Sequence, residues 1–294
     1  MASENIPYLS SHRDIQHRGT EHLAINNNFL RRSLALLALK TTARFYDQMG
    51  SCVPISKKKL IKMGPFVHLT EAATMKFVTE HTSIPVPKVF CSFVHKNIAY
   101  LVMERYQGDE LPTAWKKLSE RSRHKVFDQL KRMLQELRAL KPPHSTKVQS
   151  SVGGSLRDSR LPRSCPRFGP FDTIQEFHLW LRDGLQPSQI KGRDNDPDWQ
   201  EIQDMATEQD GPWPPPVFTH GDLNPFNILL RGDQVVGLID WEMSGWYPNY
   251  WEYTSEWLTS EHTRTEWRDS IHWFLDPFPR ELKMEATRQK WWGE

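Results

Sequence analysis

The sequence predicts an α+β fold with two unequal lobes, a small mixed α/β lobe in the N-terminal part and a larger, mainly helical lobe in the C-terminal part. Two observations support this prediction. Strand, helix and hairpin patterns alternate over residues 50–106, and a long helical pattern begins soon afterwards. The chain has 294 residues, 38% of them hydrophobic, which is enough for a sizeable core. We therefore expect an N-terminal extension with a helix over 1–49, a small lobe over 50–106 and a large lobe over 107–294.

The N-terminal extension has little periodicity up to residue 29 and then a helical pattern over about 30–48. This helix is basic and amphipathic, which is compatible with a membrane-surface or transit segment. It follows a polar stretch with acidic positions, so we favour an ordinary packed helix. The first residues lack the apolar core of a secretory signal, and the longest apolar run, Leu34–Leu39, is far shorter than the about 20 residues that span a bilayer.

The charge of the chain is nearly balanced, with 38 Lys and Arg against 36 Asp and Glu. No overall field therefore indicates nucleic acid or an anionic membrane as a partner, and we expect neither. The three cysteines, Cys52, Cys91 and Cys165, are odd in number and form no C-x-x-C pair, so neither a disulfide framework nor a zinc site is indicated. A reducing compartment fits best, and we expect a cytoplasmic protein. The sequence leaves the oligomeric state open.

The small lobe is predicted from alternating apolar residues, one helical face and a two-residue turn. Lys62 ends an apolar strand, and Gly64-Pro65 breaks it. Thr70 is the predicted N-cap of the following helix. Lys96-Asn97 has the composition of a hairpin turn. The predicted elements are a strand over 53–63, a helix over 70–81 and two strands over 88–95 and 98–106.

The large lobe is predicted from helical spacing and a later hairpin. Apolar residues recur at helical spacing over 119–140, and a second helix is predicted over 172–182. Stretches rich in Pro, Gly and polar residues, 141–171 and 184–216, are predicted to be long loops. Three strands are then expected, beginning at Val217 and covering 228–231 and 234–239.

A catalytic motif follows the first of these strands. His220-Gly221-Asp222, four further residues and then Asn227 have the spacing of a kinase catalytic loop, with Gly in the position where protein kinases carry Arg. Asp240 ends the returning strand of the hairpin, so the three side chains are expected to converge. Carboxylate and amide oxygens are ligands that Mg²⁺ prefers, which makes Asn227 and Asp240 the predicted metal ligands. Asp222 is the predicted catalytic base.

The same motif carries a resemblance to a known family. HGDLNPFNIL, followed by LIDWEMSGWYPNYWEY, resembles the aminoglycoside phosphotransferase family of kinase-like enzymes, in its fungal branch. Further segments that look like this branch are KLIKMGPFVHLTEA, TSIPVPKV, YLVMERYQGDEL, GGSLRDSRLP and FGPF. The resemblance implies a bilobal protein-kinase-like fold. It also implies Mg²⁺-dependent transfer of the γ-phosphoryl group of ATP to a hydroxyl of a small molecule.

The resemblance also assigns nucleotide-binding residues. Lys62 would contact the α- and β-phosphates, and Glu71 on the next helix would pair with it. Without the resemblance, two solvated surface charges would be the simpler interpretation. The hinge of the family, which would bind adenine through backbone groups, corresponds to Met103, Glu104, Arg105 and Tyr106.

One feature departs from the kinase pattern. No G-x-G-x-x-G precedes Lys62, and the region offers only Met49-Gly50-Ser51-Cys52. A shortened phosphate loop is implied, with fewer backbone N–H groups over the phosphates. The choice between ATP and GTP therefore stays open. The short loop is also the main support for an alternative, a non-catalytic kinase-like module that binds nucleotide or a partner.

An acidic and aromatic zone follows Asp240. It includes Glu242, Glu252, Glu256 and Glu261. One interpretation is an acceptor that carries amines, held by ion pairs and cation-π contacts. The other, which we favour for any single residue, is that these side chains pack and cap the large lobe.

Overall fold

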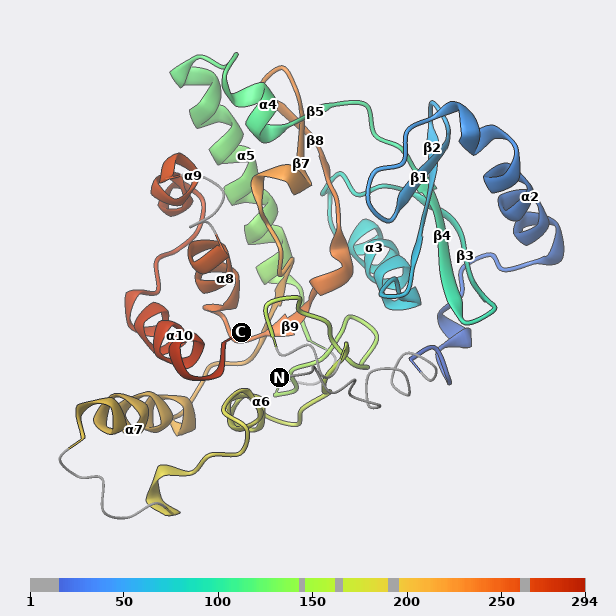
Figure 1. The fold of residues 1–294 in the computed structure, drawn as a ribbon. Helices are drawn as coiled ribbons and strands as arrows, with labels where there is room; N and C mark the ends of the chain where they lie inside the picture. The colour runs from blue at the N-terminus through green and yellow to red at the C-terminus, as the bar shows by residue number, and fades with distance from the viewer. Residues whose placement is uncertain (1–15, 143–145, 162–165, 190–195, 260–264, 294) are drawn as a thin grey trace, which may run out of the picture.

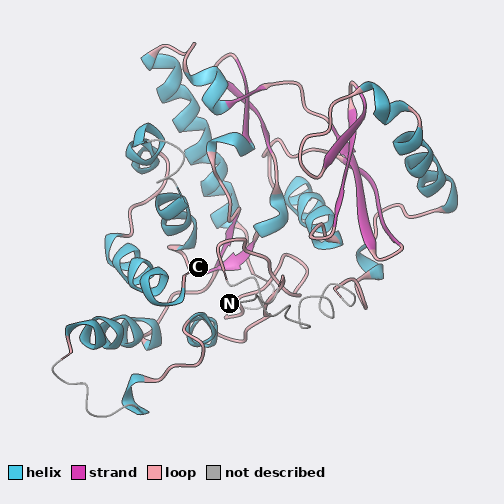
Figure 2. Cartoon of the chain, viewed as in Figure 1, coloured by secondary structure: helices cyan, strands magenta, loops and turns pink. Residues whose placement is uncertain are grey.

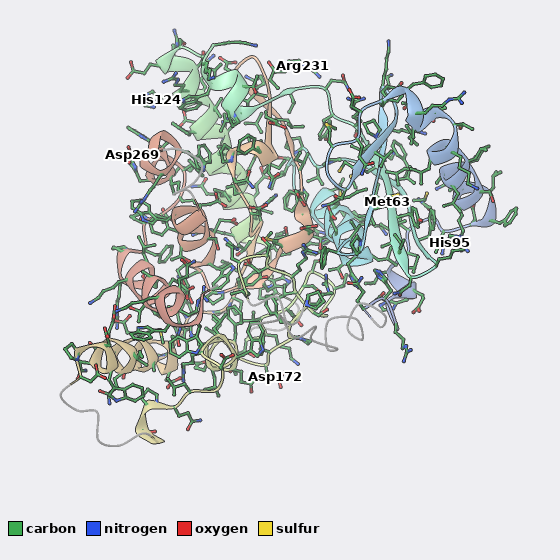
Figure 3. The ribbon with its side chains drawn as sticks, viewed as in Figure 1. Met63, His95, His124, Asp172, Arg231 and Asp269 are labelled. Atoms are coloured by element: carbon green, nitrogen blue, oxygen red, sulfur yellow. The ribbon has the colours of Figure 1, made fainter. Side chains whose placement is uncertain are left out.

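The protein is described by a computed structural model that covers residues 16–142, 146–161, 166–189, 196–259 and 265–293 (Figure 1). Two lobes lie side by side. Most of the strand structure lies in the smaller lobe, whereas helices dominate the larger one (Figure 2). Met63 and His95 mark the small lobe in Figure 3, and His124, Arg231 and Asp269 mark the large lobe. The predicted α+β, bilobal architecture is confirmed.

The small lobe is built on an antiparallel sheet with the strand order β1-β2-β4-β3. Its strands are β1 (Cys52–Ser56), β2 (Lys59–Gly64), β3 (Val89–His95) and β4 (Ile98–Glu104). The predicted turn between β3 and β4 is present, since Lys96 and Asn97 have φ of 50° and 59°.

The single strand predicted over 53–63 is wrong, because this stretch forms the β1–β2 hairpin. Its two strands pair antiparallel from Cys52 with Lys62 to Ser56 with Lys59. A tight hairpin keeps the two-residue alternation on both strands, so periodicity alone cannot separate it from one long strand. The polar run that forms the turn, 57–58, was the available signal.

Helices cover both faces of this sheet, α2 (Phe29–Lys40) on one and α3 (Leu69–His81) on the other (Figure 1). Because side chains alternate along a strand, Ile61 packs in the cluster that contains α2, and Lys62 faces the opposite side, toward α3. This alternation brings Lys62, in the middle of the strand, into the interior between the lobes.

Two helix boundaries differ from the predicted ones. The helix predicted over about 30–48 ends at Lys40, and a 3-10 turn over Thr42–Phe45 follows. The N-cap of α3 is His68 rather than Thr70, because the His68 backbone is still extended and its Nδ1 accepts from the Thr70 N–H. Imidazole is an uncommon N-cap acceptor, so the usual Ser/Thr preference gave the wrong position.

The large lobe contains two small sheets, with strand orders β5-β7-β8 and β6-β9, surrounded by helices. Its strands are β5 (Asp109–Glu110), β6 (Val217–Thr219), β7 (Ile228–Arg231), β8 (Gln234–Leu238) and β9 (Gly245–Tyr247). Its helices are α4 (Leu111–Trp115), α5 (Glu120–Ala139), α6 (Ile174–Leu181), α7 (Pro197–Asp210), α8 (Trp251–Thr259), α9 (Thr265–Ser270) and α10 (Pro279–Trp292).

Helix α7 corrects the prediction of an unbroken loop over 184–216. Asp196 caps it, and Pro197 occupies its first turn, which is a common way to start a helix. Trp199, Ile202 and Met205 are buried along one side of α7. The charged and amide residues between them lower the overall hydrophobicity of the segment, and this hid the helical spacing.

One apolar core joins the two lobes and fixes the segments between them. Phe77 of α3 has its ring centroid 5.4 Å from that of Phe218 in β6 and 6.4 Å from that of Trp246 in β9. The Leu238 N–H also donates to the Pro85 carbonyl at 2.9 Å. The loops at the lobe junction are therefore held by packing on both sides. Within the described part of the chain, no helix has the length and apolar composition needed to cross a bilayer.

Candidate active site

Lys62 lies at the centre of the junction between the lobes. Its side chain is 6% exposed. The Nζ atom donates to Glu71 Oε1 at 2.9 Å, to Asp240 Oδ1 at 2.7 Å and to Glu242 Oε2 at 3.2 Å. Glu71 comes from the first turn of α3, whereas the other two carboxylates follow strand β8. The fold thus joins the predicted Lys62–Glu71 pair to Asp240 from the other end of the chain.

Burial and charge act in opposite directions at this cluster. Burial alone would lower the pKa of Lys62, but the three carboxylates around it raise that pKa well above its ordinary value. Burial raises the pKa of Glu71, Lys62 opposes this, and Asp240 and Glu242 add to the rise. One ammonium therefore faces three carboxyl groups, and the site favours additional positive charge.

The donor set suits a hard cation. Oxygens of Glu71, Asp240 and Glu242 all lie within 4.8 Å of one another. Oxygen ligands of this kind are those that Mg²⁺ prefers. The Glu71 Oε2 atom is buried and has no hydrogen-bond partner among the described residues, which is a further sign of unused acceptor capacity. Asp240, one of the two predicted metal ligands, belongs to this group.

Asp240 itself has an uncommon backbone conformation. Its φ of 65° and ψ of 64° lie in the left-handed region, which Asp tolerates better than most residues. It directly precedes a short 3-10 helix, Trp241–Met243. The side chain is 38% exposed although it contacts the buried Lys62, so one part of the carboxylate faces the interior and another faces solvent.

Asn227, the other predicted metal ligand, lies beside Asp222. Its Nδ2 atom donates to Asp222 Oδ2 at 2.9 Å and to the Asp222 carbonyl at 2.8 Å. The Ile239 N–H donates to the Asn227 carbonyl at 3.0 Å, so Asn227 is tied to the residue that precedes Asp240. The amide nitrogen is engaged by Asp222, and the amide oxygen is the group that remains for a cation.

Asp222 is held by two carboxamides. Asn224 Nδ2 donates to its Oδ1 at 2.9 Å, and Asn227 Nδ2 donates to its Oδ2. The side chain is only partly buried, which leaves it accessible to a substrate. A carboxylate that is fixed in orientation and open to solvent has the properties of a general base.

The loop that carries Asp222 is fixed by its neighbours. His220 Nδ1 accepts from the Asp222 N–H, and Nε2 donates to the Ile239 carbonyl at 3.1 Å, so the ring links the loop to the Asp240 region. The two carboxylate oxygens of Glu252 accept from the N–H groups of His220 at 2.7 Å and Gly221 at 3.0 Å. These bonds define the loop conformation before any ligand binds.

Gly221 occupies the position where the kinase motif has Arg because there is no room for a side chain. Its φ is 85°, and a Cβ at this position would lie 2.5 Å from the Met243 carbonyl oxygen. A Cβ would therefore meet backbone, which cannot move aside as a side chain can.

An arginine from another part of the chain reaches this loop, and sequence reasoning missed it. Arg160 Nη2 donates to the Gly221 carbonyl at 2.8 Å and forms an ion pair with Asp158, whose side chain is fully buried. Burial would lower the pKa of Arg160, but Asp158 first and Asp222 and Glu256 more weakly raise it. The missing arginine of the His-Gly-Asp motif was the signal that could have prompted a search for a substitute.

The buried acidic residues downstream support the packing interpretation. Glu252 and Glu256 are 3% and 2% exposed, so they are not at a surface where an amine could reach them. Burial raises the pKa of both, and Asp222 and Glu252 add to the rise at Glu256. Glu242 contacts Lys62 and lies 3.3 Å from Arg157 Nε. Glu261 lies outside the described residues.

The predicted hinge, Met103 to Tyr106, connects β4 to the large lobe. Two of its backbone donors are already used, since the Glu104 N–H donates to the Lys88 carbonyl at 2.9 Å and the Arg105 N–H to the Lys58 carbonyl at 3.0 Å. Met103 is buried within the sheet. The Tyr106 hydroxyl donates to the Val86 carbonyl at 3.1 Å. Any contact with a base would use other backbone groups of this segment.

The predicted short phosphate loop is a tight turn. Met49 and Cys52 exchange two backbone hydrogen bonds, of 2.9 and 2.8 Å, around Gly50, which has a φ of 55°. Cys52 pairs with Lys62 across the β1–β2 hairpin, so the turn lies next to the lysine. Burial raises the pKa of the Cys52 thiol to about 11, so this cysteine is a protonated thiol at neutral pH.

Comparisons with known proteins give one family and one fold. The sequence model described as the phosphotransferase enzyme family matches residues 69–272. Among solved structures, aminoglycoside phosphotransferase APH(3'')-Id from Streptomyces rimosus, in complex with ADP and streptomycin, is 14% identical with a TM-score of 0.52 and covers 90% of this chain and 98% of its own. Aminoglycoside phosphotransferase APH(4)-Ia is 13% identical with a TM-score of 0.54 and covers 88% of each chain.

A thermostable mutant of APH(4)-Ia, in a ternary complex with ADP and hygromycin B, gives a TM-score of 0.50 at 13% identity and covers 83% of this chain and 82% of its own. Curated protein sequences give no match. At these identities the solved structures establish a shared fold, while the family model carries the relationship in sequence.

Proposed function

The chain belongs to the phosphotransferase enzyme family and has its kinase-like fold, and from this we propose that it transfers the γ-phosphoryl group of ATP, with Mg²⁺, to a hydroxyl of a small molecule. The observation that carries the proposal is a pair of polar groups linked through Ile239. One is the buried set of Lys62, Glu71 and Asp240, and the other is the Asp222–Asn227 pair, whose Asn227 carbonyl accepts from the Ile239 N–H next to Asp240. Solved structures with this fold contain ADP together with streptomycin or hygromycin B, which supports a small-molecule acceptor.

In this proposal each residue has one task. Asp222 accepts the proton of the acceptor hydroxyl while the hydroxyl oxygen bonds to the γ-phosphorus and the bond from that phosphorus to the β–γ bridging oxygen breaks, which releases ADP. Lys62, held by Glu71, donates to the α- and β-phosphates. Asp240 and the amide oxygen of Asn227 would hold the metal. Magnesium, when bound, would neutralise part of the triphosphate charge.

The nucleotide base has a proposed place as well. We assign the adenine contact to those backbone groups of Met103–Tyr106 that Lys58 and Lys88 do not already use. The short turn at Met49–Cys52 offers few donors to the phosphates, so most of the phosphate binding is assigned to Lys62 and the metal. Either ATP or GTP fits this arrangement.

The test is an acceptor screen that measures ADP release and phosphorylated product with Mg²⁺. We expect Asp222→Asn to lower turnover at least about 100-fold, since general base catalysis contributes on the order of 10²–10⁴-fold. ATP binding should be retained, because the hydrogen bonds of the Asp222 side chain to the described residues go to Asn224 and Asn227. Asp109→Asn, an exposed carboxylate on β5, is the matched control and should leave turnover unchanged.

The screen also distinguishes the proposed phosphotransferase from the alternative, a kinase-like module that binds nucleotide without turnover. The tight Met49–Cys52 turn is the observation in favour of that alternative. Binding of ATP with no ADP release across a broad set of hydroxyl compounds would favour it. A wild-type rate in Asp222→Asn would show that the base is assigned wrongly.

A further inference from the structure

Helix α2 is apolar on two opposite sides. On its inner side Ala35 is buried, and Leu36 and Leu39 pack against the outer face of the small sheet. Its outer side carries Leu30, Leu34 and Leu37, whose exposed fractions are 65%, 55% and 55%, and Phe29 in its first turn is 84% exposed. Figure 3 shows side chains standing out from the side of α2 that is turned away from the sheet. A helix that is apolar on both sides is normally covered on both.

These residues belong to a concentration of exposed apolar side chains. Phe45 and Met49, just beyond α2, are 71% and 53% exposed. Together with the four residues of α2 they make six of the eleven exposed large apolar side chains in the described part of the chain. Single exposed apolar residues are normal, but such a concentration indicates an interaction surface.

Cations flank the exposed leucines. At about 100° per residue, Lys40 lies about 60° from the edge of the Leu30, Leu34 and Leu37 stripe. Arg31 lies equally far on the other side, but its Nη1 donates to the Phe90 carbonyl at 3.0 Å, so its guanidinium is held against the small lobe. Lys40 is exposed, as is Arg44 after the helix, and α2 contains no acidic residue. An apolar stripe bordered by cations matches a bilayer surface with anionic head groups, in which the leucines enter the acyl boundary and the cations contact phosphate or carboxylate groups.

The charge pattern favours a bilayer, rather than a second copy of the chain, as the partner of this face. Two copies of α2 packed through their outer sides would bring together two helices that carry only basic charges, with no acidic residue on either helix to neutralise them. We propose that the outer face of α2, formed by Leu30, Leu34 and Leu37 with Lys40 and the following Arg44, docks the small lobe on an anionic lipid bilayer. This revises two expectations, that of no membrane partner, which rested on the balanced overall charge, and that of an ordinary packed helix in this segment.

The test is flotation of the full chain with lipid vesicles. We expect binding to vesicles of phosphatidylcholine with about 30% phosphatidylserine and little binding to phosphatidylcholine alone, with binding reduced at high salt. Leu30→Gln with Leu34→Gln and Leu37→Gln should lower the partition coefficient at least about tenfold. Lys40→Gln with Arg44→Gln should lower it about fivefold for each cation.

Matched controls are taken from the large lobe. Trp291→Gln removes an exposed apolar side chain, and Lys116→Gln with Lys131→Gln removes two exposed cations. Neither control should change the binding of the chain to vesicles. Each variant should keep the thermal midpoint of the wild type, since the changed side chains are exposed.

Three results would overturn the proposal. The first is no flotation of the wild type, and the second is equal flotation with neutral and anionic vesicles. The third is a dimer in solution that the leucine substitutions convert to a monomer, because this would assign the face to a second copy of the chain. None of these results depends on ATP or on an acceptor, so the proposed phosphotransfer can fail or hold independently.

Discussion

At the scale of single residues, the catalytic loop depends on a glycine and a distant arginine. Gly221 brings its backbone against Met243, and Arg160 bonds to the carbonyl of this glycine from a loop 61 residues earlier in the chain. The motif His-Gly-Asp could be recognised from the sequence because its spacing is local. The roles of Arg160 and Glu252 could not be recognised in this way. Their partners are backbone atoms 31 to 61 residues away, and no spacing rule connects residues so far apart in the sequence.

The steric requirement for glycine at position 221 can be tested by adding one methyl group. Gly221→Ala should lower the free energy of unfolding by at least about 2 kcal/mol, since the new Cβ meets the Met243 carbonyl and φ is positive. Gly232→Ala is the matched control, because Gly232 has a φ of 62° and nothing within 4 Å of a Cβ. It should cost only the conformational strain of about 1 kcal/mol. Equal losses of unfolding free energy in the two variants, measured by urea denaturation, would show that the contact with Met243 is unimportant.

The arginine can be tested by a double-mutant cycle with its partner. Arg160→Gln leaves the fully buried carboxylate of Asp158 without its cation, so it should lower stability by about 3–5 kcal/mol. Asp158→Asn in the same chain should recover part of that loss, because the uncompensated charge is then gone. Additive losses in the cycle, measured by denaturant unfolding, would contradict a direct ion pair.

Glu256 should make stability depend on pH. Burial, Asp222 and Glu252 raise its pKa well above 4.5, so the folded state holds this proton more tightly than the unfolded state. The stabilisation is complete below about pH 4.5 and is lost as the pH rises through the folded pKa. Glu256→Gln should therefore make the fall of the thermal midpoint above pH 5 less steep. Glu120→Gln, at the exposed start of α5, should leave the slope as in the wild type.

At the scale of secondary-structure elements, the sequence was most informative where a turn or a cap has a strict residue requirement. The Lys96-Asn97 hairpin and the start of α5 at Ser119 follow such rules. The β1–β2 hairpin and helix α7 were missed because their apolar residues repeat correctly but the polar composition around them resembles a strand end or a loop. Periodicity locates buried faces better than it locates chain reversals.

The β3–β4 turn provides an element-scale prediction. Asn97 has a φ of 59°, which Gly adopts freely and a β-branched residue does not. Asn97→Val should lower the free energy of unfolding by about 1–2 kcal/mol, whereas Asn97→Gly should be neutral or slightly stabilising. Similar losses for both variants would contradict the left-handed turn. Thermal unfolding followed by circular dichroism measures the difference.

At the scale of the whole molecule, a continuous core positions charges that are far apart in the sequence. Lys62 and Asp240 are 178 residues apart and meet at 2.7 Å because α3 packs against the large lobe through Phe77. The sequence motif predicted that Asp222, Asn227 and Asp240 would converge, and the fold ties Asn227 to the residue before Asp240 through the Ile239 N–H. The details that it could not predict, such as Lys62 lying among three carboxylates, arise from the side-chain packing of the folded chain.

The most direct test of this arrangement is a calorimetric titration of ATP with and without Mg²⁺, in the wild type, in Asp240→Asn and in the control Asp109→Asn. Asparagine tolerates the left-handed backbone of Asp240 and removes only the charge. We expect Mg²⁺ to raise the ATP affinity of the wild type and of the control, and we expect Asp240→Asn to lose at least about tenfold of that affinity. An ATP affinity that does not depend on Mg²⁺, or one that Asp240→Asn leaves unchanged, would contradict a magnesium-nucleotide site at the lobe junction.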